Sequence, residues 1–197
     1  LATAVTEGEL EEILNRYGGN YLSHLSFLGD KFFFIASDKQ AFLQFGKISN
    51  KLIVLGDPAG AQTSFYPLLT EFYQHAARLG YEVIFYQVKA ENMSMYHDFG
   101  NSFFKLGEEA IVDLACFSIA GKKQAGLRAT KNRFERDGYQ FEVLFPPLSD
   151  ALFNQLQRVS TAWLGRKKEK GFSLGYFDRT YLERSPLGVL RNEQGQV

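Results

Sequence analysis

Lysine and arginine side chains are concentrated in one short stretch of the sequence. Residues 122–136 contain six cations and one anion, Glu135. Because like charges repel one another along a helix unless something neutralises them, such a stretch is typical of a surface that binds phosphates. An acidic part of the same chain would neutralise it equally well, so both interpretations stay open. The cations are Lys122, Lys123, Arg128, Lys131, Arg133 and Arg136.

A second basic cluster lies about thirty residues further on, at Arg166, Lys167, Lys168 and Lys170. It follows a predicted helix, whose carboxyl end is stabilised by nearby cations. That effect explains one or two of the four charges and does not require the rest. Two separated clusters fit a partner with many phosphates, an RNA or a lipid surface, better than one small anion.

Three other features have both a structural and a chemical interpretation. The turn-forming run at residues 56–60 follows a predicted strand but lacks the spacing of a phosphate-binding loop, so it is a tight turn or the edge of a ligand cleft. Cys116 lies in an apolar run, which predicts a buried thiol rather than a nucleophile. His24, His75 and His97 are isolated, so the sequence indicates no metal site.

The charge of the chain is balanced in total but not along its length. The 22 Lys and Arg residues equal the 22 Asp and Glu residues, yet residues 1–119 hold 8 basic and 14 acidic side chains and residues 120–197 hold 14 and 8. The 45% hydrophobic content excludes a disordered chain. No apolar run approaches the length of a membrane span, so we expect this segment not to cross a membrane.

The first part of the sequence predicts a compact α+β domain. Thr6 and Glu9 form a capping box that begins a short amphipathic helix. Turn residues separate segments rich in aromatic and β-branched residues, which predicts an antiparallel meander, and apolar residues at helical spacing predict two inserted helices. The predicted strands are 21–27, 31–36, 41–48, 51–55, 82–88, 103–106 and 110–117, and the helices are 65–79 and 92–99.

The second part begins with a basic helix predicted over residues 121–137. At 100° per residue Lys122, Arg133 and Arg136 fall on one face, and Leu127 and Phe134 lie nearly opposite. A strand at 139–145, a helix beginning at Ser149 or Asp150, and strands at 172–177 and 187–190 follow. We therefore predict a first lobe at 1–118, a basic connecting helix at 119–138, and the beginning of a second lobe at 139–197.

The ordered set of short motifs resembles a known family over nearly the whole chain. The sequence is similar to the cytosolic part of bacterial phosphatidylglycerol lysyltransferases, the multiple peptide resistance factors. The motifs are Leu55-Gly56-Asp57-Pro58-Ala59-Gly60, Phe85-Tyr86-Gln87-Val88, Lys105-Leu106-Gly107-Glu108-Glu109-Ala110, Gly121-Lys122-Lys123, Leu127-Arg128, Asn132-Arg133, Asp137-Gly138-Tyr139, and the run from Lys168 to Asp178.

This resemblance implies two acyltransferase lobes of the GNAT type, joined by the basic helix, with the second lobe truncated in this chain. It implies transfer of an aminoacyl group, lysyl or in some members alanyl, from charged tRNA to phosphatidylglycerol. It also implies an N-terminal multi-span membrane region in the full-length bacterial protein, with this segment on the cytoplasmic side. The activity needs no cofactor and no metal, and it makes the membrane less anionic, which confers resistance to antimicrobial peptides.

Charge and position then assign candidate roles within that activity. Glu169 has a carboxylate suited to a cationic amino acid, although a plain solvated glutamate fits the charge run equally well. No residue is identified as the general base. The candidates for tRNA or lipid phosphates are Lys122, Lys123, Arg128, Lys131, Asn132, Arg133, Arg136, Arg166, Lys167 and Lys168, and those for an aminoacyl pocket are Glu169, Phe172, Ser173, Gly175 and Tyr176.

Three other functions remain as alternatives. An acetyl-CoA-dependent acetyltransferase would share the fold, but the pyrophosphate-binding turn of such enzymes is missing from the sequence. A peptidoglycan-bridge aminoacyltransferase would use charged tRNA with a cell-wall acceptor. A non-catalytic module that binds tRNA or a membrane would use the same cations.

Overall fold

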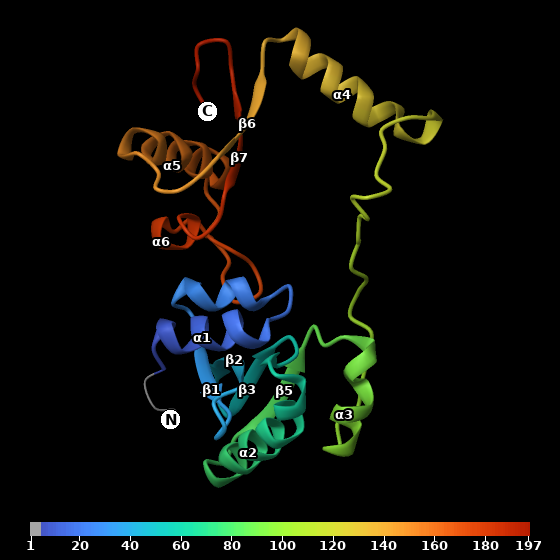
Figure 1. The fold of residues 1–197 in the computed structure, drawn as a ribbon, viewed down its shortest axis with the longest axis vertical. Helices are drawn as coiled ribbons and strands as arrows, with labels where there is room; N and C mark the ends of the chain where they lie inside the picture. Colours follow the sequence, from blue (N-terminus) through green and yellow to red (C-terminus); the bar gives the residue numbers. More distant parts are fainter. Residues whose placement is uncertain (1–4) are drawn as a thin grey trace. The chain divides into compact units, whose positions relative to one another are not determined.

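The computed structural model describes residues 5–197, which form two compact units (Figure 1). The first unit comprises residues 5–102 together with 169–176, and the second comprises 103–168 and 177–197. The chain therefore leaves the first unit and returns to it for one short segment. The predicted division into a lobe at 1–118, a connecting helix at 119–138 and a second lobe from 139 onward stays a prediction.

The first unit is built on one mixed sheet. Its strands follow the order β1-β2-β3-β5, with β4 paired to β2. All these pairings are antiparallel except that of β3 with β5, which is parallel because helix α2 intervenes between them. The predicted meander is thus confirmed for the segments 31–36, 41–48 and 51–55. The strands are β1 (Phe32–Ile35), β2 (Ala41–Ile48), β3 (Lys51–Leu55), β4 (Ala59–Gly60) and β5 (Glu82–Tyr86), and α2 is Phe65–Arg78.

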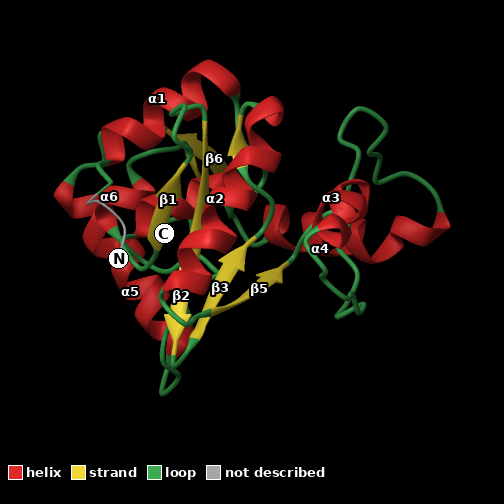
Figure 2. Cartoon of the chain, turned by 90° about the horizontal axis from the view of Figure 1, so that it is seen from below, coloured by secondary structure: helices red, strands yellow, loops and turns green. Residues whose placement is uncertain are grey.

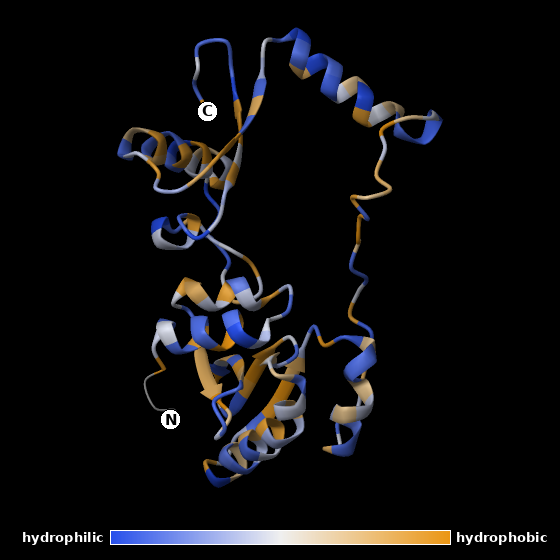
Figure 3. Ribbon diagram, viewed as in Figure 1, coloured by the Kyte–Doolittle hydropathy of each residue, from blue (hydrophilic) through white to orange (hydrophobic). Residues whose placement is uncertain are grey.

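Apolar side chains cover both faces of this sheet. Helices lie around its strands (Figure 2), and the strands themselves are coloured mainly as hydrophobic in Figure 3. Alternate residues of β2 point to opposite faces, so Leu43 and Phe45 pack with Phe72 of α2, while Phe42 packs with Leu10 of α1 (Glu7–Tyr17). The capping box of α1 is present, with the Glu9 amide donating to Thr6 Oγ1 at 3.3 Å. The short helices of this unit are η1 (Ser23–Leu28), η2 (Gln62–Ser64), η3 (Ala90–Asn92) and α3 (Met93–Asp98).

Four predicted strands are wrong. The stretch 21–27 forms the 3₁₀-helix η1, because Leu22, Leu25 and Leu28 recur every three residues and are all buried. The stretches 103–106 and 110–117 are exposed and carry neither helix nor strand, since no strand among the described residues pairs with them. Cys116 is exposed for the same reason, against the prediction of a buried thiol. The stretch 172–177 also forms no strand.

The second unit combines helices with a two-stranded antiparallel sheet. The β6–β7 ladder runs from Gln140 paired with Arg191 to Leu144 paired with Leu187. Of the described residues of this unit, Leu148 and Val189 are the buried apolar side chains. No helix within residues 5–197 has the length and apolar character needed to cross a membrane. The elements are η4 (Lys122–Gln124), α4 (Ala125–Arg136), β6 (Gln140–Leu144), α5 (Asp150–Leu164), α6 (Arg179–Leu182) and β7 (Leu187–Arg191).

Candidate functional site

Helix α4 displays the first basic cluster on an open surface. None of its residues is buried, and Arg133 and Arg136 share one face because they are three residues apart. Lys122 lies in the 3₁₀ turn η4, outside the α-helix. The α-helical spacing of 100° per residue, which predicted it on the same face as these arginines, therefore does not apply to it. Of the two apolar residues predicted opposite the cations, Phe134 packs on Tyr139, with 5.1 Å between ring centroids, while Leu127 is half exposed.

The partners of these cations all lie close by in the sequence. Lys131 Nζ is 2.5 Å from Glu135 Oε1, and Arg136 Nε is 3.2 Å from Asp137 Oδ1. Arg128 donates through Nη1 to the carbonyl oxygens of residues 119 and 121, at 2.5 and 2.6 Å, and so fixes the start of the helix. Within residues 5–197, no ion pair involves Lys122, Lys123 or Arg133, which leaves their charges available to an anion.

The second basic cluster follows the end of α5. Arg166, Lys167 and Lys168 are exposed, and the Lys167 amide donates to the carbonyl of Leu164 at 2.9 Å. The helix ends at Gly165, whose φ is 56°. The cluster therefore stands where the helix dipole favours positive charge, as the sequence predicted.

The candidate aminoacyl residues belong to the first unit, whereas the candidate phosphate-binding residues belong to the second. Glu169 and Gly175 are exposed, whereas Phe172, Ser173 and Tyr176 are half-buried. This segment, residues 169–176, is kept out of an extended strand by Phe172, whose φ of 63° lies in the left-handed region.

Asp30 and Lys31 hold this segment on the first unit and were missed by the sequence reasoning. The Phe172 amide donates to Asp30 Oδ2 at 2.7 Å across 142 positions of sequence. The Tyr176 hydroxyl donates to the carbonyl of Leu28, at the end of η1. No periodicity or motif links residues so far apart, and the only signal was a lysine directly before a run of phenylalanines.

A buried polar network lies at the carboxyl ends of the parallel strands β3 and β5. The carboxylate of Asp57 accepts from the Tyr96 hydroxyl at 2.9 Å and from the Lys89 amide at 3.0 Å. Burial, followed by the charge of Asp57, raises the pKa of Tyr96 far above its usual value. The Gly56 amide donates to the carbonyl of Tyr86 at 2.7 Å beside the β3–β5 ladder, and Ala59–Gly60 is β4, so the run at 56–60 is a bend between two strands.

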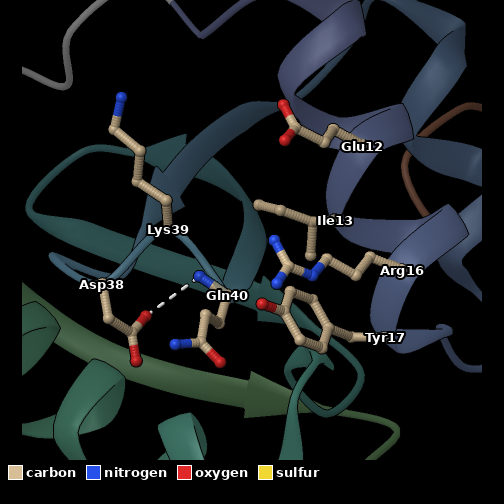
Figure 4. A pocket seen from close by; sticks show the side chains of 7 residues that line it. All are labelled: Glu12, Ile13, Arg16, Tyr17, Asp38, Lys39 and Gln40. Carbon is tan, nitrogen blue, oxygen red and sulfur yellow. Dashed lines mark hydrogen bonds between the residues drawn. The ribbon is translucent and has the colours of Figure 1, made fainter.

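A cavity of about 240 Å³ lies between α1 and the β1–β2 turn (Figure 4). Its Asp38 carboxylate is already engaged by the Gln40 amide at 2.9 Å and by the Ser64 hydroxyl at 2.6 Å. The lining contains both acidic and basic side chains, so the cavity is not a positively charged site for a phosphate. Within the described residues, no three His, Cys, Asp or Glu side chains are grouped to hold a metal ion. The lining residues are Glu12, Ile13, Arg16, Tyr17, Asp38, Lys39 and Gln40.

A mostly antiparallel sheet covered by helices agrees with the acyltransferase fold that the sequence resemblance implies. The family described as "Phosphatidylglycerol lysyltransferase, C-terminal" matches residues 11–197. The chain therefore belongs to the phosphatidylglycerol lysyltransferase family, a family of aminoacyltransferases.

Individual relatives agree with that assignment. The chain is 55% identical to phosphatidylglycerol lysyltransferase of Bacillus subtilis (strain 168) over 95% of its length, and 53% identical to that of Staphylococcus aureus (strain MRSA252) over 96%. It spans 22% of the length of each. The solved structure of L-PGS from Bacillus licheniformis superposes with a TM-score of 0.96 at 55% identity, covering 100% of this chain and 60% of that one.

Proposed function

We propose that the full-length protein carrying this chain transfers a lysyl group from lysyl-tRNA to a headgroup hydroxyl of phosphatidylglycerol at the cytoplasmic face of a bacterial membrane. The similarity to the lysyltransferases of Bacillus subtilis and Staphylococcus aureus carries this proposal. The exposed cations of η4 and α4 support it. Among the described residues, only Lys131 and Arg136 of these cations have carboxylate partners, each within four residues in the sequence, so most of the positive charge is available to phosphates.

The reaction is a transesterification. The glycerol hydroxyl oxygen forms a bond to the ester carbonyl carbon and loses its proton, and the terminal ribose oxygen of the tRNA leaves and takes up a proton. Because the ester is already activated, the protein has mainly to hold the two substrates together and to stabilise the oxyanion.

Residues of this chain divide between two binding tasks in this proposal. The cations contact tRNA or lipid phosphates. Lys122, Lys123 and Arg133 do so most directly, since Lys131 and Arg136 each have a carboxylate partner and Arg128 holds the helix start. The segment containing Glu169, Phe172 and Tyr176 receives the aminoacyl group. A transmembrane region preceding this chain in the full-length protein supplies the lipid.

The test is transfer of labelled lysine from charged tRNA to phosphatidylglycerol vesicles by the full-length protein. We expect labelled lysyl-phosphatidylglycerol, and a tenfold or greater loss when Arg133 and Arg136 are both changed to Ala. The matched control changes Arg78 and Arg158, exposed arginines of α2 and α5, and should retain activity. Label in muropeptides, or acetyl transfer from acetyl-CoA in place of lysyl transfer, would contradict the proposal.

A further inference from the structure

Lys31 is a buried cation with two fixed partners. Its side chain is 0% exposed, and Nζ donates to the carbonyl of Leu25 at 3.0 Å and to Asp30 Oδ1 at 2.5 Å. A buried ammonium is tolerated only when it is paired and hydrogen-bonded. The ammonium therefore fixes the Asp30 carboxylate in one orientation.

The other oxygen of Asp30 is directed at the returning segment. Oδ2 accepts the Phe172 amide at 2.7 Å, a short bond of the charge-assisted kind. Gly171 permits this approach, because a Cβ at that position would lie 2.7 Å from the same oxygen. The Asp30 carboxylate thus links a buried cation on one side to the backbone of residues 171–172 on the other.

The conformation of Phe172 shows that the surroundings impose the geometry. A φ of 63° is rare for a bulky residue and persists only where other contacts determine it. The ring lies against Gly46 of β2, where a Cβ would be 3.2 Å from Phe172 Cε2. The Tyr176 hydroxyl, bonded to the carbonyl of Leu28, fixes the far end.

We propose that Asp30, held by Lys31, is a positioning residue that docks residues 171–176 on the first unit and so orients the aminoacyl group for transfer. This inference rests on the proposed function, because the role of the segment in holding that group is itself proposed. Neither Asp30 nor Lys31 needs to contact substrate. Their effect passes through the backbone of Phe172.

The docking is tested by hydrogen exchange on the full-length protein. Asp30→Asn leaves Lys31 without its counter-charge and risks unfolding, so Gly171→Ala is the second variant: its methyl, 2.7 Å from Asp30 Oδ2, separates that oxygen from the Phe172 amide while both charged residues are retained. We expect exchange of the amides of residues 172–176 to rise at least tenfold while β2 and β3 stay protected. Gly8→Ala, with nothing within 4 Å of the added methyl, is the control. Unchanged exchange in Gly171→Ala would overturn the docking.

The positioning role is tested by lysyl transfer with the same variants. We expect kcat/KM of Gly171→Ala to fall at least tenfold, while its Kd for tRNA, set by the cations, stays within twofold of the wild type. Loosened amides with unchanged transfer would overturn the positioning role but leave the proposed function intact. A wild-type protein that transfers no lysine would refute the proposed function, and the exchange result would still decide the docking.

Discussion

The ionisation of Tyr96 is coupled to the stability of the first unit. Its side chain is 1% exposed, and burial next to the Asp57 carboxylate raises the pKa of its hydroxyl. Above about pH 10 the unfolded chain releases this proton and the folded chain keeps it, so folding stability falls as pH rises. The contribution of the Tyr96 proton to the free energy of unfolding is therefore fully present below pH 10. Above pH 10 the free energy of unfolding falls by up to about 1.4 kcal/mol per pH unit.

Replacing Tyr96 by Phe should flatten this alkaline decline. At pH 7 the change should cost about 1–3 kcal/mol, because Asp57 Oδ1 loses its donor. Urea unfolding of the chain between pH 7 and pH 10.5 measures both effects. Tyr66→Phe, at a residue that is 51% exposed, is the control and should keep the wild-type slope. Equal slopes in wild type and Tyr96→Phe would show that Tyr96 is not the titrating group.

Contacts between residues close in the sequence can be predicted from residue types, whereas contacts between distant residues cannot. Thr6 and Glu9 were predicted correctly as a capping box, because both partners lie within one helical turn. Asp30 and Phe172 were not paired in advance, because their contact depends on how the whole chain returns to the first unit. Cys116 was predicted buried from its apolar neighbours, which are themselves exposed.

The sequence predicts well those helices and strands in which apolar residues repeat at a regular spacing. Helix α2 and strands β2 and β3 lie within a residue or two of their predicted bounds, since burial on a defined face repeats along each of them. The stretches at 103–117 and 172–177 have the composition of strands but form none, because a strand also needs a neighbour and composition does not supply one. Helix α4 was predicted by its composition, but the contacts that its cations make were not.

The charges of α4 lead to a prediction about salt. If Arg133 and Arg136 each neutralise one phosphate, changing both to Ala should lower the slope of log Kd for tRNA against log salt concentration by about 1–2. Fluorescence anisotropy with this chain between 50 and 300 mM salt measures the slope. The pair Arg78→Ala and Arg158→Ala removes the same charge from α2 and α5 and should leave the slope unchanged. The same slope in all three proteins would exclude a phosphate-binding role for this face.

At the scale of the whole chain, the connection at residues 103–121 sets where the molecule opens first. It contains neither helix nor strand, and Phe104, Ile111 and Leu114 are each at least 80% exposed. Exposed backbone without a hydrogen-bond ladder is cut by proteases without prior unfolding, whereas sites in the sheet of the first unit need that unit to open.

Brief chymotrypsin digestion of this chain should therefore cut first between residues 103 and 118. Mass spectrometry of the products identifies the cut, and Phe42 and Phe72, which are 1% and 0% exposed, serve as internal controls in the core. The early rate should rise in proportion to protease concentration and stay nearly constant in low urea, because cleavage there needs no unfolding. Cuts in the core should instead accelerate steeply with urea. A first cut in β2 or α2, or a strong urea dependence between 103 and 118, would overturn this prediction.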